Sequence, residues 1–181
     1  MTYEIDQSGK IEQTEKDTIL AFTNGNACSI MIPRRVKRQL QEIFRLCGFT
    51  RLFIYYLFSV GVFFLISNLK KEEHIVIDIE YSGKDKLLSS IIIKLLENYK
   101  KPVHNIIFSR IGNHPKVHYA AKDVFDKKRK ADKILTLHEA LKAIKKTDGL
   151  LRECLSTLVD AQPRSRLKIY HKKNQKSSIK P

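Results

Sequence analysis

Two acidic residues stand inside an otherwise apolar segment near the middle of the chain. Asp78 and Glu80 alternate with isoleucines in the sequence HIVIDIEY, and this period of two predicts a strand over residues 74–81 with both carboxylates on one face. Acids are rare in a buried strand unless they are paired or bind a metal ion. Ligands also gather at the carboxyl ends of strands in open α/β sheets. We therefore expect Glu80, which is nearer the strand end, and Asp78 to belong to a functional site.

Three short strands are expected before this segment, because apolar runs there are bounded by turn residues. They cover residues 3–8, 18–23 and 27–32. The turn Asn24-Gly25-Asn26 separates the last two apolar runs, and an Asn-Gly pair in that place is a strong hairpin signal. The opening of the chain is therefore predicted to be an antiparallel β-meander.

Two helices of different character are expected between the meander and the acidic strand. Pro33 begins a basic amphipathic helix over residues 34–46. Residues 51–69 are nearly all apolar and are predicted to form a buried helix on account of their length, with two strands broken near Gly61 as an alternative. The unbroken apolar part, residues 52–66, is shorter than the roughly 20 residues of a membrane-spanning helix. We expect a core helix and no membrane partner, with a single-span membrane protein as the alternative.

The acidic strand is followed by elements that predict a parallel crossover and a helical end. A helix is expected over residues 84–99, a strand over 105–111, and helices over 116–127, 137–146 and 149–160. The strand, helix, strand succession predicts a right-handed parallel crossover, and Thr136 with Glu139 forms a capping-box pattern. We expect one domain over residues 1–133, a helical extension over 134–170 and a basic disordered tail over 171–181.

The order of these elements, with an acid in the first strand and acids near the end of the fourth, resembles the ribonuclease H-like superfamily, in particular its resolvase-like nucleases. The resemblance extends from the first strand to the helix at 116–127. It implies an α/β fold with a mixed sheet, made of three antiparallel strands plus parallel strands and flanked by helices. In that fold the first strand carries an Asp, the fourth ends in an acid, and the last helix supplies an acid or His. The matching positions are Asp6, Asp78 or Glu80, and His118, Asp123 or Asp126.

The resemblance implies a Mg²⁺- or Mn²⁺-dependent endonuclease that hydrolyses phosphodiester bonds in DNA or RNA. Two such ions about 3.5–4 Å apart need bridging oxygen ligands, and adjacent parallel strands can bring Asp6 and Glu80 to one site. The implied catalytic residues are Asp6, Glu80, Asp78, His118 and Asp123, and the carboxylates among them are the implied metal ligands. The apolar helix at 51–69 lacks the Glu that ribonucleases H proper carry there, which favours a resolvase-like member.

Each of these residues also has a purely structural interpretation. Asp6 precedes Ser8-Gly9 and could form an Asx turn at a strand end. His118 could be an ordinary surface histidine, and Asp123 lies among lysines with which a helix forms ion pairs. A non-catalytic nucleic-acid-binding protein with the same fold is therefore the alternative function.

A strong positive charge indicates the class of partner. The chain has 34 Lys and Arg residues against 19 Asp and Glu, a formal net charge of +15, so its surface should attract a polyanion such as nucleic acid. The residues expected to bind phosphates are Arg34, Arg35, Lys37, Arg38, Lys127, Lys128 and Arg129. A basic protein whose charge only keeps it soluble is the alternative.

The cysteines and the N-terminus indicate the compartment. Cys28, Cys47 and Cys154 are odd in number and lack CxxC or His-pair spacing, which argues against disulfides and structural zinc. The polar N-terminal residues lack the layout of a secretory signal. We therefore expect a cytoplasmic protein, and a homodimer remains an open alternative.

Overall fold

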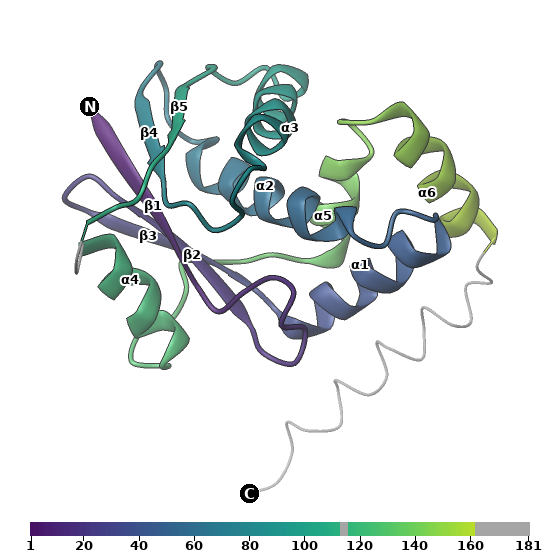
Figure 1. The fold of residues 1–181 in the computed structure, drawn as a ribbon, viewed down its shortest axis with the longest axis horizontal. Coiled ribbons are helices and arrows are strands. Elements are labelled where there is room, and N and C mark those ends of the chain that lie inside the picture. Colours follow the sequence, from purple (N-terminus) through teal and green to yellow (C-terminus); the bar gives the residue numbers. More distant parts are fainter. Residues whose placement is uncertain (113–115, 162–181) are drawn as a thin grey trace, which may run out of the picture.

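Six strands form one mixed sheet in the described part of the chain, which comprises residues 1–112 and 116–161 of the computed structural model (Figure 1). The strands are β1 (Thr2–Ser8), β2 (Thr18–Thr23), β3 (Ala27–Ile32), β4 (His74–Ile77), β5 (Asn105–Phe108) and β6 (Lys133–Ile134). They lie in the order β5-β4-β1-β2-β3-β6. β1, β2 and β3 are antiparallel neighbours, whereas β4 runs parallel to β1, β5 to β4 and β6 to β3. The predicted meander and the α/β class with a mixed sheet are confirmed.

The two faces of the sheet have different partners, because side chains alternate along each strand. Ile5 of β1 is fully buried in the main hydrophobic core. The next residue, Asp6, points to the opposite face. There its partner in register on β2, Ala21, joins a smaller apolar cluster with Val117 of helix α4 (Lys116–Phe125). The strand alternation thus presents Asp6 to the side of the sheet that α4 covers.

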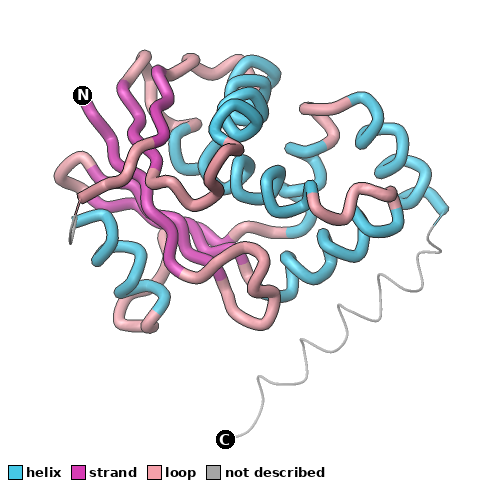
Figure 2. The backbone as a smooth tube through the Cα atoms, viewed as in Figure 1, coloured by secondary structure: helices cyan, strands magenta, loops and turns pink. Residues whose placement is uncertain are grey.

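Helix α2 (Leu52–Ile66) lies against the main-core face and packs against several other helices (Figure 2). Its neighbours are α1 (Arg34–Leu46), α3 (Asp85–Asn98) and α5 (Leu137–Ile144), and α5 in turn contacts α6 (Gly149–Ala161). Because it is covered on several sides, α2 has no polar face. Gly61 allows close approach to the sheet, since a Cβ there would lie 2.5 Å from Leu20 Cδ1.

The helix prediction for residues 51–69 is therefore confirmed, and the two-strand alternative is wrong. None of the described helices, α2 included, combines the length and the apolar character needed to cross a bilayer. The helix is instead part of the main hydrophobic core, to which Leu57 and Phe58 contribute buried side chains.

Two strands are shorter than predicted, and a third was not predicted. β4 ends at Ile77 and β5 ends at Phe108. Beyond these ends, Oδ1 of Asp78 accepts a hydrogen bond of 2.9 Å from the backbone N–H of Ile111. β6 consists of two residues that pair with β3, which is too short for any apolar alternation to reveal.

The chain continues the main core beyond residue 133, the expected domain boundary, which falls within β6. Leu135 and Ala140 are fully buried in the same hydrophobic cluster as the sheet. Helix α5 begins with the predicted capping box, in which the side chains of Thr136 and Glu139 each accept a hydrogen bond from the other residue's backbone N–H. The tail expected over 171–181 lies outside the described residues.

A disulfide bond joins Cys47, at the C-terminal end of α1, to Cys154 in α6. Their Cα atoms are 5.9 Å apart although 107 positions separate the two residues in the sequence. The expectation that the cysteines form no disulfide is therefore wrong. The fold brings together two residues whose spacing carries no pairing signal, while Cys28 is a free cysteine.

The loop between β1 and β2 begins at Gly9, where both the backbone and the packing require glycine. Its φ is +75°, and a Cβ there would lie 2.6 Å from the carbonyl oxygen of Asp17 and 2.6 Å from Cε2 of Phe125. We expect Gly9→Ala to lower the free energy of unfolding in urea by more than the roughly 1–2 kcal/mol that a left-handed backbone alone costs. Gly83→Ala is the matched control, because Gly83 has a φ of +73° and open space around its Cβ position. Equal losses in the two variants would contradict a role for the contacts at Gly9.

Candidate metal centre

Three carboxylates meet where β1 and β4 run side by side. Ile5 of β1 pairs with Ile77 of β4 in the parallel ladder, so the next residues, Asp6 and Asp78, follow on adjacent strands. One oxygen atom from each of Asp6, Asp78 and Glu80 lies within 4.8 Å of the other two. The structure therefore brings together the carboxylates of the first strand and of the HIVIDIEY segment. We call these three residues the acidic cluster.

Asp6 is held by two contacts and is only 7% exposed. Its Oδ1 accepts a hydrogen bond of 2.6 Å from the backbone N–H of Gln7, and its Oδ2 lies 2.9 Å from Nδ1 of His118 on α4. When Nδ1 carries the proton it donates to Asp6, and Nε2 is then the proton acceptor of the ring. A carboxylate paired with imidazole in this way sets the tautomer and the orientation of the ring. His118 therefore contacts the acidic cluster.

Asp78 is positioned by β1 on one side and by the segment after β5 on the other. Its backbone N–H donates a hydrogen bond of 2.9 Å to the carbonyl oxygen of Ile5. Its side-chain Oδ1 accepts from the backbone N–H of Ile111, which lies between β5 and α4. Each carboxylate oxygen has two lone pairs, so these contacts leave acceptor capacity for a cation.

Glu80 is partly buried and lies close to the carboxylates of Asp6 and Asp78. Burial, followed by the carboxylates of Asp6 and Asp78, raises the pKa of Glu80 to about 7, while the charge of Lys10 acts in the opposite direction. Like charges gathered in a partly buried place repel one another, and a bound cation relieves that repulsion. Carboxylate oxygens are hard ligands that suit Mg²⁺ or Mn²⁺. The donor chemistry of the acidic cluster therefore fits a divalent cation.

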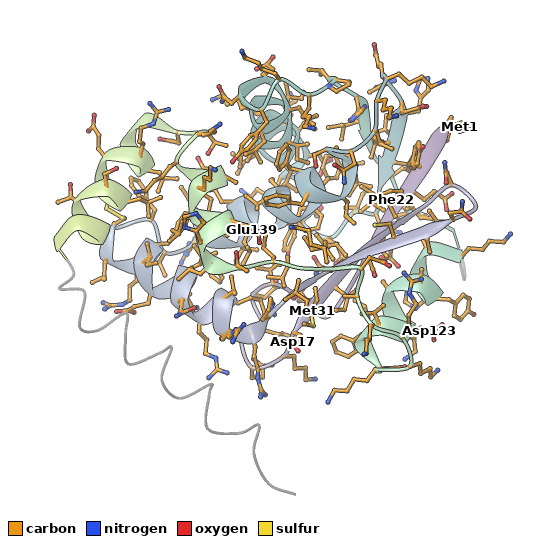
Figure 3. All side chains as sticks on the ribbon, turned by 180° about the vertical axis from the view of Figure 1, so that it is seen from behind. Met1, Asp17, Phe22, Met31, Asp123 and Glu139 are labelled. Atoms are coloured by element: carbon orange, nitrogen blue, oxygen red, sulfur yellow. A yellow bond between two sulfur atoms is a disulfide. The ribbon has the colours of Figure 1, made fainter. Side chains whose placement is uncertain are left out.

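The carboxylates of α4 and the turn after it are engaged elsewhere. The side chain of Asp123 is 47% exposed, and its Oδ1 lies 3.5 Å from Nζ of Lys128; Figure 3 shows Asp123 on α4. Asp126 accepts a hydrogen bond from Lys122 at 2.8 Å. Within residues 1–112 and 116–161, the group of potential metal ligands includes neither aspartate. The contribution of α4 to the acidic cluster is therefore His118.

The basic residues expected to bind phosphates divide into accessible and engaged side chains. Arg34, Arg35 and Arg38 are exposed on α1, and Lys127 and Lys128 are exposed after α4. All five side chains are accessible to a polyanion, although Nζ of Lys128 lies 3.5 Å from Oδ1 of Asp123. The other two residues of the expected set form hydrogen bonds within the protein.

Arg129 and Lys37 form hydrogen bonds within the protein. Nη2 of Arg129 donates to Asp132 at 2.5 Å and to the carbonyl oxygen of Ala27 at 3.4 Å. Lys37 is fully buried, with 0% exposure. The prediction that Lys37 binds phosphates is therefore wrong, because its side chain points from α1 to the loop between β1 and β2. Two carbonyl oxygens of that loop and Oγ1 of Thr18, the first residue of β2, accept its hydrogen bonds.

The loop between β1 and β2, residues 9–17, supplies charges that the sequence analysis did not single out. Lys10 and Glu12 both act electrostatically on Glu80. At the far end of the loop, Oδ1 of Asp17 accepts a hydrogen bond of 2.7 Å from the backbone N–H of Arg34, the first residue of α1 (Figure 3). The sequence feature that could have indicated Lys10 and Glu12 is their position directly after the strand that carries Asp6, because loops at such places often contribute residues to functional sites.

The described residues thus contain an acidic cluster on which a strand, a strand end and α4 converge, with a charged loop beside it. This arrangement could bind a divalent cation. No protein-family model, curated protein or solved structure matches the chain.

Proposed function

We propose that this protein is a metal-dependent endonuclease of the ribonuclease H-like superfamily that hydrolyses phosphodiester bonds in DNA or RNA. The observation that carries the proposal is the approach of Asp6, Asp78 and Glu80 within 4.8 Å. The sheet order supports it as well, because the central strand β1 lies between an antiparallel β2 and a parallel β4. That is the arrangement that the resemblance implies.

The side chains of the site have two roles in this reaction, binding of the cation and transfer of a proton. Asp6, Asp78 and Glu80 would hold the cation, and Mg²⁺ or Mn²⁺ bound there would supply Lewis-acid chemistry toward a phosphodiester and toward a water nucleophile at neutral pH. His118 orients the Asp6 carboxylate through Nδ1 and can accept or deliver a proton at Nε2. The acidic cluster therefore supplies charge, and the histidine supplies proton transfer.

The net charge of +15 supports nucleic acid as the substrate. Arg34, Arg35 and Arg38 are exposed on α1, whose first residue is hydrogen-bonded to the loop at residues 9–17. Lys127 and Lys128 are exposed just after α4, the helix that carries His118. Phosphates held by these two groups of residues would bring a strand to the acidic cluster.

The test is cleavage of a panel of labelled substrates by the full chain. The panel contains a four-way DNA junction, duplex DNA, single-stranded RNA, an RNA hairpin and an RNA–DNA hybrid, each with Mg²⁺, with Mn²⁺ and with EDTA. We expect cleavage of at least one substrate with either metal and none with EDTA. Absence of cleavage from the whole panel, together with no Mn²⁺ density at the acidic cluster in a soaked crystal, would overturn the proposal.

One observation favours a second function, a nucleic-acid-binding protein that does not cleave. Helix α4 brings His118 to the acidic cluster, whereas Asp123 pairs with Lys128 instead of adding a fourth carboxylate. This function predicts equal binding of nucleic acid with and without metal, and a steep loss of affinity as salt concentration rises. Metal-dependent cleavage would rule it out.

A further inference from the structure

The buried ammonium group of Lys37 is hydrogen-bonded to the loop at residues 9–17. Lys37 of α1 is fully buried. Its Nζ donates hydrogen bonds of 2.8 Å to the carbonyl oxygens of Lys10 and Gln13 and to Oγ1 of Thr18. An ammonium has three donors, so each of them has an oxygen partner.

Such a group is costly for the stability of the protein, which suggests that it has another role. A buried charge is tolerated only when it is hydrogen-bonded, and an apolar residue of similar volume often stabilises the fold more. Burial lowers the pKa of Lys37 to about 8, and the carboxylates of Asp17, Glu15 and Glu12 act in the opposite direction. The hydrogen bonds of the ammonium go to the loop at residues 9–17 and to the start of β2.

The oxygens that Lys37 binds are the ones that shape the loop. The carbonyl oxygen of Lys10 also accepts from Gln13 N–H at 3.2 Å and from Thr18 Oγ1 at 3.1 Å. The carbonyl oxygen of Gln13 also accepts from the backbone N–H of Lys16 at 3.2 Å. Lys37 therefore links the two turns of the loop to each other and to α1.

The loop is also joined to the segment that carries Glu80. The hydroxyl of Tyr81 donates to Oε2 of Glu12 at 3.3 Å, and the tyrosine follows Glu80 directly in the chain. Lys10 has an exposed side chain, and its backbone is fixed by the bonds described above. Its positive charge acts to lower the pKa of Glu80, against the effect of burial and of the neighbouring carboxylates.

We propose that Lys37 is a positioning residue, whose buried ammonium fixes the loop at residues 9–17 so that Lys10 is presented to an anionic group bound at the acidic cluster. The anion would be a phosphate of the substrate, and this last step rests on the proposed nuclease function. Three carboxylates repel a phosphate, and the ammonium of Lys10 would offset that repulsion and stabilise the charge that develops during hydrolysis. Lys37 acts only through the loop and does not touch substrate.

The first experiment measures the loop itself and does not depend on activity. We expect Lys37→Met to raise the hydrogen-exchange rates of the Gln13 and Lys16 amides about tenfold or more, while amides of the sheet stay protected. Leu40→Ala is the matched control, because Leu40 is fully buried on the same helix but packs in the main core. Loop exchange in Lys37→Met equal to that of the wild type, or no greater than in Leu40→Ala, would overturn the proposal.

Thr18→Val covers the case in which Lys37→Met does not fold. It removes one acceptor of the ammonium and the hydroxyl that donates to Lys10, and it keeps the buried charge. We expect a smaller but specific rise in exchange at Gln13 and Lys16. Unchanged exchange in this variant would count against the proposal as decisively as in the first.

The second experiment asks whether Lys37 and Lys10 act as one unit. We expect Lys10→Met to lower kcat on a cleaved substrate about 10²-fold, Lys37→Met to lower it by a similar factor, and the double variant to lose little more than either. If the wild type cleaves nothing, the same cycle is measured on Mn²⁺ affinity. There the loss of the Lys10 charge should raise the affinity, and Lys37→Met should reproduce that change. Additive effects in the cycle would overturn the positioning role, because independent residues add.

Discussion

Asp6→Asn is expected to lower metal-dependent cleavage about 10³-fold while leaving the protein folded. The amide has nearly the shape of the carboxylate, so the contacts with Gln7 and His118 can be kept in part. The negative charge that holds a divalent cation is lost. The measurement is the rate of product formation under saturating Mg²⁺, with circular dichroism to verify folding.

The matched control for this prediction is Asp123→Asn. Asp123 is the aspartate that the sequence also predicted to be a ligand, and it is half-exposed and paired with Lys128. We expect near wild-type cleavage from it. Cleavage that survives Asp6→Asn, or that is lost equally in both variants, would remove the acidic cluster from the reaction.

The affinity of the acidic cluster for Mn²⁺ is expected to depend strongly on pH, because Glu80 can hold a proton in place of the ion. Because burial and the carboxylates of Asp6 and Asp78 raise the pKa of Glu80 to about 7, a cation must displace a proton at lower pH. We expect the affinity for Mn²⁺ to fall about tenfold per pH unit below about pH 7, with release of one proton per ion bound. Titration calorimetry in buffers of different ionisation enthalpy measures both quantities. An affinity that does not change between about pH 7 and about pH 5.5 would contradict the prediction.

The raised pKa of Glu80 also determines how the stability of the metal-free protein changes with pH. The pKa of Glu80 in the folded state lies above its ordinary value of 4.5. Its protonated form therefore contributes stability that is fully present below about pH 4.5 and is lost as pH rises through about 7. Glu80→Gln should be more stable than the wild type at about pH 8 and close to it at about pH 4.5, as measured by urea denaturation. The exposed Glu97→Gln is the control, and an equal pH trend in both variants would contradict the assignment to Glu80.

Local patterns predicted most of the fold because the elements concerned depend on local chemistry. The hairpin at Asn24-Gly25-Asn26 and the capping box at Thr136 are set by a few neighbouring residues, and both are present. Helix α2 was predicted from length alone. The contact between Asp78 and Ile111, beyond the ends of β4 and β5, could not be predicted, because it joins segments far apart in the chain.

The acidic cluster was predictable because parallel neighbours deliver their next residues to one place, and Asp6 and Asp78 follow a paired Ile5 and Ile77. The role expected for Asp123 depended on which side of α4 it occupies. Asp123 is five positions after His118, which is about 140° around a helix of 3.6 residues per turn. Only one of the two can face β1, and it is His118.

Lys37 shows where sequence patterns mislead. A lysine in a basic amphipathic helix is normally assigned to the solvated side, and an ammonium buried against loop carbonyls leaves no periodic signal. The disulfide bond between Cys47 and Cys154 also has no sequence signal, because it depends on where α6 lies in the fold and not on the spacing of the cysteines in the sequence. Both features arise from contacts that exist only once the chain has folded.

The apolar character of α2 has a consequence for how the chain is made. During synthesis α2 leaves the ribosome before α3 and α5, although both of these later helices pack against it. A nascent chain that has reached only β4 therefore carries a helix without a polar side and without its full cover. We expect α2 to expose apolar side chains until α3 and α5 have been synthesised and have packed against it.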